Sequence, residues 1–183
     1  MELISAREAV LEHFRWDGGH ADVWAVFRDG PALAAVVRGL VEPFRRAGVT
    51  AVVGVESRGF LLGGAAAVQL GVGFVPVRKA GGLFPGPKLA RDTDPDYRGL
   101  RHTLRLRRDA LTAQDRVLLV DDWIETGSQA AAVRELALGC GARWAGCAVV
   151  VDQLTGRRRP ALGPIHGLLR ATDLPPVPRA VEG

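Results

Sequence analysis

The sequence predicts an α/β fold in which a parallel, twisted sheet is flanked by helices. Three short apolar runs rich in β-branched residues are typical of strands buried on both faces, and they lie at residues 50–55, 73–78 and 117–120. Two of them are followed by segments of small, helix-forming residues, at 60–70 and 128–138. Another strand is expected at 145–151, after glycines that end the second helix. This alternation favours a parallel sheet, and such sheets bind ligands at their carboxyl-terminal strand ends.

The N-terminal part is expected to contain two helices and one short extended segment. Apolar residues recur at helical spacing along residues 2–15, and a glycine pair ends this helix. Along residues 23–28 the side chains alternate between two faces, which predicts a short strand. Asp29 then caps the clearest amphipathic helix, which has a proline in its first turn and runs to Phe44.

The 183 residues, 48% of them hydrophobic, are expected to form one domain over residues 1–183. The uncharged apolar runs are too short to span a bilayer, and the first residues carry acidic groups where a signal peptide has basic ones. We therefore expect a cytoplasmic protein with no membrane partner. The two cysteines, Cys140 and Cys147, fit reduced structural thiols better than a disulfide or a metal site.

The net charge of +4 comes from arginines clustered at residues 101–108 and 157–159. Such clusters can attract an anionic substrate or a nucleic acid. Neither cluster is interleaved with the aromatic side chains that favour single-stranded nucleic acid. We therefore expect no nucleic-acid partner.

Residues 117–129, VLLVDDWIETGSQ, place a buried strand, a short loop and the start of a helix in succession. A helix N-terminus presents unpaired backbone N–H groups and the positive end of the helix dipole, so a phosphate can bind there. Gly127 lets the backbone come close to such an anion, and Thr126 and Ser128 add hydroxyl donors. A Walker-type P-loop is excluded, because no lysine follows the glycine.

Asp121 and Asp122 come directly after the apolar residues of this strand. Carboxylates at that place can accept hydrogen bonds from sugar hydroxyls or hold a hydrated magnesium ion. A single ligand that carries phosphate, ribose and metal would therefore use the whole motif. The alternative is an ordinary strand-to-helix turn with a capping threonine and two solvated aspartates.

A second strand-to-helix turn has the sequence Glu56-Ser57-Arg58-Gly59. Its backbone N–H groups and its arginine suit a second polyanion such as pyrophosphate. A surface turn without a ligand is the alternative for these four residues.

The segment at about residues 79–102 is rich in glycine and proline and shows no periodicity. We expect it to be a flexible lid loop, because long structureless loops in small domains are often lids or binding loops. A basic lid can close over a polyanion and keep water away from a reactive centre. An unstructured loop without a function is the alternative. Pro76, within the preceding strand, cannot donate to a sheet ladder.

These motifs, taken in order, resemble the type I phosphoribosyltransferases, and most closely the adenine phosphoribosyltransferases. The resemblance runs from about residue 25 to residue 152 and is carried by FRD, ESRGFLLG, GVGFVPVRKAG and VLLVDDWIETGS. It implies transfer of the 5-phosphoribosyl group of phosphoribosyl pyrophosphate (PRPP) to a purine base, most simply adenine, with Mg²⁺ as cofactor. It also implies a parallel sheet with a lid and a small hood, formed by about residues 1–30 and part of the C-terminal tail. A homodimer is expected by the same analogy.

The resemblance assigns roles to residues of this sequence. Asp121 and Asp122 would hold the ribose hydroxyls, with Mg²⁺ reaching them through PRPP and water and with no direct protein ligand. The 5-phosphate would be bound by Glu125, Thr126, Gly127, Ser128 and Gln129. Pyrophosphate would be bound by Glu56, Ser57, Arg58, Gly59, Arg78 and Lys79, in a region that includes the family's non-proline cis peptide. The base would lie near Val26, Phe27 and Arg28.

The chain departs from the family pattern at several positions. Glu125 places a carboxylate where the family has a small residue, and Gln129 replaces a threonine. The family's catalytic Glu-Tyr pair of the lid falls at Arg98 and Gly99 without gaps, or at Asp96 and Tyr97 after a shift of two residues. We favour the shifted pair.

Three hypotheses about function therefore remain. The first is an active purine phosphoribosyltransferase that uses adenine. The second is a PRPP-binding regulator without catalysis, and the third is a phosphoribosyltransferase for another base.

Overall fold

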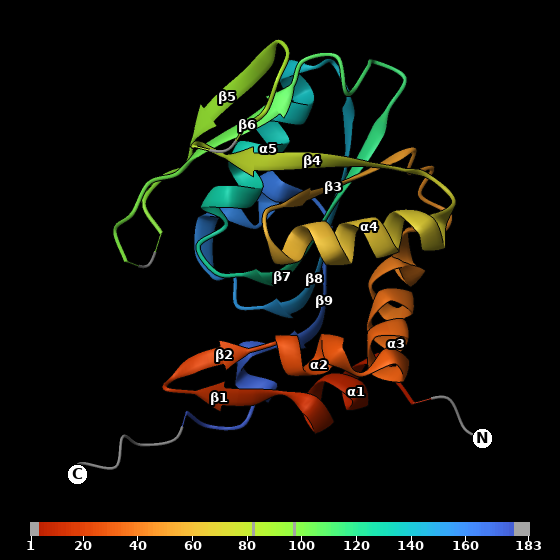
Figure 1. Cartoon of the computed structure of the whole chain (residues 1–183), viewed down its shortest axis with the longest axis vertical. Helices are drawn as coiled ribbons and strands as arrows, with labels where there is room; N and C mark the ends of the chain where they lie inside the picture. Colours follow the sequence, from red (N-terminus) through yellow and green to blue (C-terminus); the bar gives the residue numbers. More distant parts are fainter. Residues whose placement is uncertain (1–3, 82, 97, 178–183) are drawn as a thin grey trace.

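The computed structural model of the chain describes residues 4–81, 83–96 and 98–177. Within them a seven-stranded sheet has the order β5-β6-β4-β3-β7-β8-β9 (Figure 1). The parallel strands are β3 (Ala51–Val55), β4 (Gly73–Lys79), β7 (Arg116–Ile124), β8 (Arg143–Asp152) and β9 (Ile165–Arg170). The antiparallel strands β5 (Lys88–Asp92) and β6 (Thr103–Arg107) extend the sheet beyond β4. The predicted parallel α/β sheet is thus confirmed.

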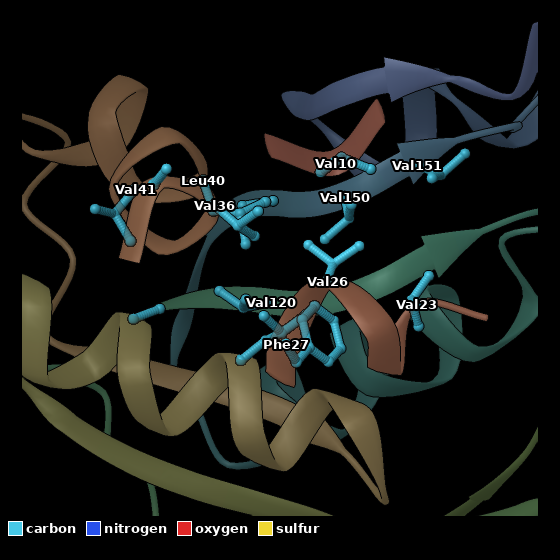
Figure 2. Packing of buried hydrophobic residues seen from close by; sticks show 14 of the residues in the cluster. Val10, Val23, Val26, Phe27, Val36, Leu40, Val41, Val120, Val150 and Val151 are labelled. Carbon is cyan, nitrogen blue, oxygen red and sulfur yellow. The ribbon is translucent and has the colours of Figure 1, made fainter. Parts of the chain in front are cut away.

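Helices cover both faces of this sheet. The helices are α1 (Ala6–His13), α2 (Trp24–Arg28), α3 (Gly30–Val41), α4 (Arg58–Leu70) and α5 (Ser128–Gly139). Side chains alternate along β7, so Leu118 and Val120 pack into the cluster with α1 to α4, part of which Figure 2 shows. Val117 and Leu119 point the other way and pack into a second cluster with α5. Burial on both faces explains the continuous apolar runs in the sequence.

A small N-terminal layer lies at one end of the sheet (Figure 1). It consists of α1, the hairpin of β1 (Arg15–Asp17) and β2 (His20–Asp22), and α2, and we call it the hood. The C-terminal segment joins it, because the indole N–H of Trp16 donates to the carbonyl of Pro175 at 2.7 Å. The remaining short elements are 3-10 turns at Glu42–Phe44, Gly156–Arg158, Pro160–Leu162 and Ala171–Asp173.

The first predicted helix is shorter than expected. It begins after Ser5, whose hydroxyl accepts from the N–H of Glu8 while the Glu8 carboxylate accepts from the N–H of Ser5. It ends at His13, because Phe14 turns to extended geometry. The glycine pair that was expected to end a helix forms the turn of the β1–β2 hairpin.

The expected strand at residues 23–28 is wrong, because these residues form α2. Val23, Val26 and Phe27 are all buried, which is the spacing of one face of a helix. The carboxylate of Asp22 accepts hydrogen bonds from the N–H groups of Trp24 and Ala25 and thereby starts the turn. Over six residues, alternation and helical spacing cannot be told apart. The prediction that Asp29 caps the following helix is confirmed, since its carboxylate accepts from the N–H of Ala32 in α3 at 2.8 Å.

The expected structureless segment at residues 79–102 contains the strand β5, so this part of the prediction is wrong. After β4 the segment forms β5, which pairs with β6, and β6 pairs with β4. Of the residues of β5, only Leu89 packs against the core, and the other four are exposed. The hydrophobic alternation that would mark a strand is therefore missing from the sequence.

Strand β7 also runs further than predicted, through both aspartates to Ile124. Asp121 and Asp122 lie within its last residues, and β8 continues to pair alongside them. Pro76 is accommodated because β6 pairs with β4 only at Arg78 and Lys79. The C-terminal region contributes the regular strand β9 at the sheet edge, and no helix among the described residues is long and apolar enough to cross a membrane.

Candidate active site

The carboxyl-terminal ends of β3, β4 and β7 open into one cavity of about 700 Å³. The turn after β3, the end of β4 and the loop after β7 form its floor, as expected for a parallel sheet. The hood lines it on one side with Trp16, His20 and Trp24. The segment at residues 79–102, which we call the lid after its predicted role, contributes Asp96 and His102 to the cavity wall. The two predicted turns therefore face a common space.

The two aspartates at the end of β7 differ in their surroundings. Asp122 is only 6% exposed, and its Oδ2 lies 2.9 Å from Nε of Arg58 on α4. The pKa of Asp121 is raised well above its ordinary value, first by burial and then by the negative charge of Asp122. Gly59 makes this arrangement possible, because a Cβ there would lie 3.1 Å from Oδ1 of Asp121. The helix N-terminus can thus come close to the carboxylates.

The turn after β3 is held by its own glutamate. One carboxylate oxygen of Glu56 accepts from Nε of Arg78 at 3.0 Å, and the other accepts from the N–H of Lys79 at 2.6 Å. The peptide bond between Glu56 and Ser57 is cis. Glu56 therefore positions the end of β4 beside the turn, while Arg58 and Lys79 line the cavity. The cavity wall thus carries two cationic side chains, which could bind a polyanion.

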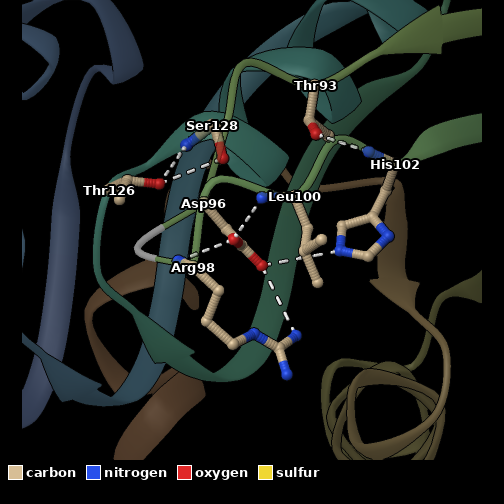
Figure 3. Close-up of polar contacts among 7 residues, drawn as sticks. All are labelled: Thr93, Asp96, Arg98, Leu100, His102, Thr126 and Ser128. Atoms are coloured by element: carbon tan, nitrogen blue, oxygen red, sulfur yellow. Dashed lines mark hydrogen bonds and ion pairs between the residues drawn. The ribbon is translucent and has the colours of Figure 1, made fainter.

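The loop after β7, residues 125–129, brings a helix N-terminus to the cavity. Gly127 has φ +72°, a left-handed conformation that favours glycine, and it precedes the first residue of α5. The hydroxyl of Thr126 accepts from the N–H of Ser128 at 3.3 Å and donates to its hydroxyl at 3.0 Å (Figure 3). The carboxyl of Glu125 has a raised pKa because of burial and because Asp96 of the lid lies near. We call residues 125–129 the phosphate loop.

The lid reaches the phosphate loop through an arginine from the C-terminal region. Arg158 donates to the backbone carbonyl of Thr126 at 3.2 Å and to the carboxylate of Asp94 at 2.5 Å. One member of the arginine cluster at 157–159 therefore joins the lid to the phosphate loop. Another member, Arg159, donates to both oxygens of Asp152 at the end of β8.

The residues predicted to bind the base lie in two different surroundings. Val26 is fully buried in the core, while Phe27 and Arg28 line a second cavity of about 780 Å³ together with Leu61. Trp24 lines both cavities. Of the predicted lid pair, Asp96 faces the first cavity, and Tyr97 lies outside the described residues.

The sequence of the chain is similar to those of known proteins. Residues 23–170 match the phosphoribosyl transferase domain family. The chain belongs to this family. It is 44% identical over 154 residues to the adenine phosphoribosyltransferase of Streptomyces coelicolor, covering 81% of this chain and 83% of the relative. The adenine phosphoribosyltransferase of Streptomyces avermitilis is 40% identical over 182 residues, covering 92% of this chain and 98% of the relative.

Solved structures of adenine phosphoribosyltransferases have a similar fold. The crystal structure of adenine phosphoribosyltransferase from Rhodothermus marinus superposes with a TM-score of 0.80 and 38% identity, over 90% of this chain and 98% of that chain. This phosphoribosyltransferase chain therefore has the type I fold, as predicted. The cavity at its strand ends is the candidate active site.

Several cavity and lid residues were not singled out from the sequence. Trp16 and Trp24 of the hood and His102 of the lid line the cavity, and Arg158 joins its two walls. None of them lies in a motif with a recognisable spacing, because they come from four separate segments. The only sequence signal was the arginine cluster, which did not show which arginine faces the loop.

Proposed function

We propose that this phosphoribosyltransferase transfers the 5-phosphoribosyl group of PRPP to adenine and forms adenosine monophosphate and pyrophosphate. The single observation that carries the proposal is the arrangement at the strand ends. Asp121 and Asp122 precede the phosphate loop at the end of β7, Arg58 follows the neighbouring strand β3, Lys79 ends β4 next to it, and all of them line one cavity. This order matches the order of groups in PRPP, which has a phosphate, a ribose with two hydroxyls, and a pyrophosphate.

The chain's residues bind and orient PRPP in this proposal. The N-terminus of α5, with Thr126 and Ser128, receives the 5-phosphate. Asp121 and Asp122 accept hydrogen bonds from the ribose hydroxyls, which holds the reacting carbon C1′ over the cavity. Arg58 and Lys79 take the pyrophosphate, whose negative charge grows as its bond to C1′ breaks. A ring nitrogen of the base forms the new bond to C1′ and loses its proton.

Magnesium belongs to the same proposal. Asp121 and Asp122 place carboxylate oxygens on the cavity wall, and such oxygens suit a hard cation that keeps several of its waters. Bound with PRPP, Mg²⁺ would neutralise part of the pyrophosphate charge. No cluster of three or more metal-binding side chains occurs among the residues that the structure describes, so substrate oxygens and water would supply the ligands of the ion, and Asp121 and Asp122 would contact it through them.

The base subsite is proposed to lie at the hood, with Val26, Phe27 and Arg28 forming its support. Phe27 makes an edge-to-face contact with Trp24, whose indole is half exposed and lines both cavities. A flat base can stack on such a ring. We also expect a homodimer that acts in the cytoplasm, and sedimentation at micromolar concentration would test the dimer.

A PRPP-binding protein without catalysis is the second candidate. Glu125 favours it, because this carboxylate stands in the phosphate loop, where the charge of the 5-phosphate would repel it. The pKa of Glu125 is raised, so this repulsion weakens as pH falls and the carboxyl becomes protonated.

Pyrophosphate release from PRPP and Mg²⁺ separates the two candidates. Adenine, hypoxanthine, guanine, xanthine, uracil and orotate are each tested alone, and PRPP binding is measured by calorimetry. We expect release with adenine. Release with another base alone would correct the substrate, and PRPP binding without release with any base would establish the second candidate.

A further inference from the structure

A histidine and an aspartate of the lid meet over the candidate active site. Nε2 of His102 lies 3.6 Å from Oδ2 of Asp96 (Figure 3). Both side chains line the first cavity and are largely shielded, with 25% of the His102 side chain and 13% of the Asp96 side chain exposed. The distance exceeds that of a hydrogen bond, but catalytic hydrogen bonds in ligand-free enzymes are often long and shorten when substrate binds.

The backbone holds this pair in place. Oδ1 of Asp96 accepts from the N–H groups of Arg98 and Leu100 at 2.8 and 2.9 Å. His102 is held from the other side of the lid, because its N–H donates to the hydroxyl of Thr93 at 3.0 Å and its carbonyl accepts from the N–H of Thr93 at 2.8 Å. Thr93 is only 1% exposed. These hydrogen bonds involve five residues of the lid, and Oδ2 of Asp96 then lies 3.5 Å from the Arg98 guanidinium and 3.6 Å from Nε2 of His102 (Figure 3).

Asp96 is suited to orient a histidine. Partial burial acts to raise its pKa, but the hydrogen bonds from Leu100 and Arg98, with the Arg98 guanidinium, outweigh this and lower the pKa overall. The group is therefore a carboxylate, and it can accept a hydrogen bond from a proton-bearing Nε2 if the two atoms come closer when substrate binds. Histidine with its proton on Nε2 has a free lone pair on Nδ1, which can accept another proton.

The acceptor base has such a proton to lose. We propose that His102 accepts the proton that leaves the ring nitrogen of the base, and that Asp96 is its positioning residue. This inference rests on the proposed function. As the ring nitrogen bonds to C1′, the bond from C1′ to the pyrophosphate oxygen breaks and its electron pair leaves with pyrophosphate. The N–H proton passes to Nδ1, and Asp96 stabilises the imidazolium that forms.

Other charged side chains line the same cavity as His102. The other charged or titratable residues of the cavity wall are Arg98 of the lid, His20 of the hood, and, from the strand ends, α4 and the phosphate loop, Glu56, Arg58, Lys79, Asp121, Asp122 and Glu125. The N–H of Ala80, next to Lys79, donates to the carbonyl of Thr103, next to His102. His102 therefore stands close in the chain fold to the groups proposed for pyrophosphate, and the experiment must separate proton transfer from pyrophosphate binding.

The test compares His102→Asn and Asp96→Asn with the wild type in the complete reaction. We expect His102→Asn to lower kcat about 100-fold, a usual contribution of a general base. The Kd of PRPP by calorimetry should change less than about twofold. The decline of wild-type kcat on the acid side should be absent in this variant. Asp96→Asn keeps an oxygen for the two backbone N–H groups but removes the charge, so kcat should fall and the acid decline should move to lower pH.

Two comparisons make the outcome decisive. Arg91→Gln changes an exposed residue of β5 in the same lid and should leave kcat unchanged. His102→Gln replaces His102→Asn if the latter fails to fold, as judged by circular dichroism. The proton role is overturned if His102→Asn leaves kcat and the pH profile unchanged. It is also overturned if the variant only raises KM for pyrophosphate in the reverse reaction and leaves kcat unchanged. A wild type that binds PRPP but reacts with no base overturns the proposed function, and this inference with it.

Discussion

Arg58 and Asp122 form an ion pair across the candidate active site, with Nε and Oδ2 2.9 Å apart. Arg58 is the first residue of α4 and belongs to the predicted turn at residues 56–59. Asp122 lies near the end of β7, the strand that precedes the phosphate loop. One group is proposed to bind pyrophosphate and the other to bind ribose. The ion pair therefore joins the two halves of the proposed PRPP site in the ligand-free protein.

Asp122→Asn should abolish turnover and preserve the fold. The amide keeps an oxygen that can accept from Arg58, but it removes the charge that holds the ribose hydroxyls. We expect kcat/KM for PRPP to fall at least about 100-fold, measured as pyrophosphate release with adenine. Circular dichroism serves as the check on folding. Wild-type turnover in this variant would remove the assigned ribose role.

Asp121→Asn should stabilise the ligand-free protein near neutral pH while lowering activity. Because burial and Asp122 raise the pKa of Asp121 in the folded state, the unfolded chain releases this proton at lower pH than the folded chain does. The free energy of unfolding of the wild type therefore decreases as pH rises from the ordinary pKa of Asp121 in the unfolded chain to its raised pKa in the folded chain. Asparagine removes the loss, which we expect to be roughly 1 kcal/mol, or about 2–4 °C in Tm for a domain of this size.

The pH dependence of Tm tests this explanation. The difference between variant and wild type should be largest near pH 7 and should vanish near pH 3, where Asp121 is protonated in both states. A difference that is the same at both pH values would mean that packing, and not ionisation, causes it.

Glu125→Gln should tighten PRPP binding. The glutamate carboxylate lies in the phosphate loop, so an uncharged amide of similar shape removes repulsion from the 5-phosphate. We expect Kd for PRPP to fall roughly 3–10-fold at pH 8, as typical for one partly screened charge. Because the pKa of Glu125 is raised, wild type should approach the variant as pH falls. Weaker binding by the variant would instead show that Glu125 contacts the ligand favourably.

Gly54→Ala should destabilise the protein and disturb the turn at residues 56–59. A Cβ at Gly54 would lie 2.1 Å from the carbonyl oxygen of Gly59, and neither backbone can move away without breaking the turn. We expect a loss of roughly 2–4 kcal/mol in the free energy of unfolding. Gly64→Ala is the matched control, because it lies inside α4 with nothing within 4 Å and should stabilise by roughly 0.5–1 kcal/mol. Equal stability of the two variants, by urea unfolding, would contradict the prediction.

The sequence predicted best where strand, turn and helix follow one another in the chain. The phosphate loop and the turn at residues 56–59 were located because a buried strand and the helix after it define both ends of the turn. Asp29 was likewise recognised as a cap, since its partner is only three residues away. The strand β5 within the lid and the helix α2 were not predicted, because their regular structure depends on contacts with distant segments. β5 exists through β6, and the helical face of α2 is defined by the core.

The sequence by itself determined the type of sheet, the two strand-to-helix turns at residues 56–59 and 125–129, and the family. These features depend on local periodicity and short motifs, which can be recognised in the sequence without knowing the tertiary structure. Only the tertiary structure decided what faces the cavity. It joined Arg58 to Asp122, brought Arg158 to Thr126 and set His102 against Asp96. The physical reason is that β-sheet order and lid pairing place residues from separate segments side by side, and no spacing in the sequence encodes that proximity.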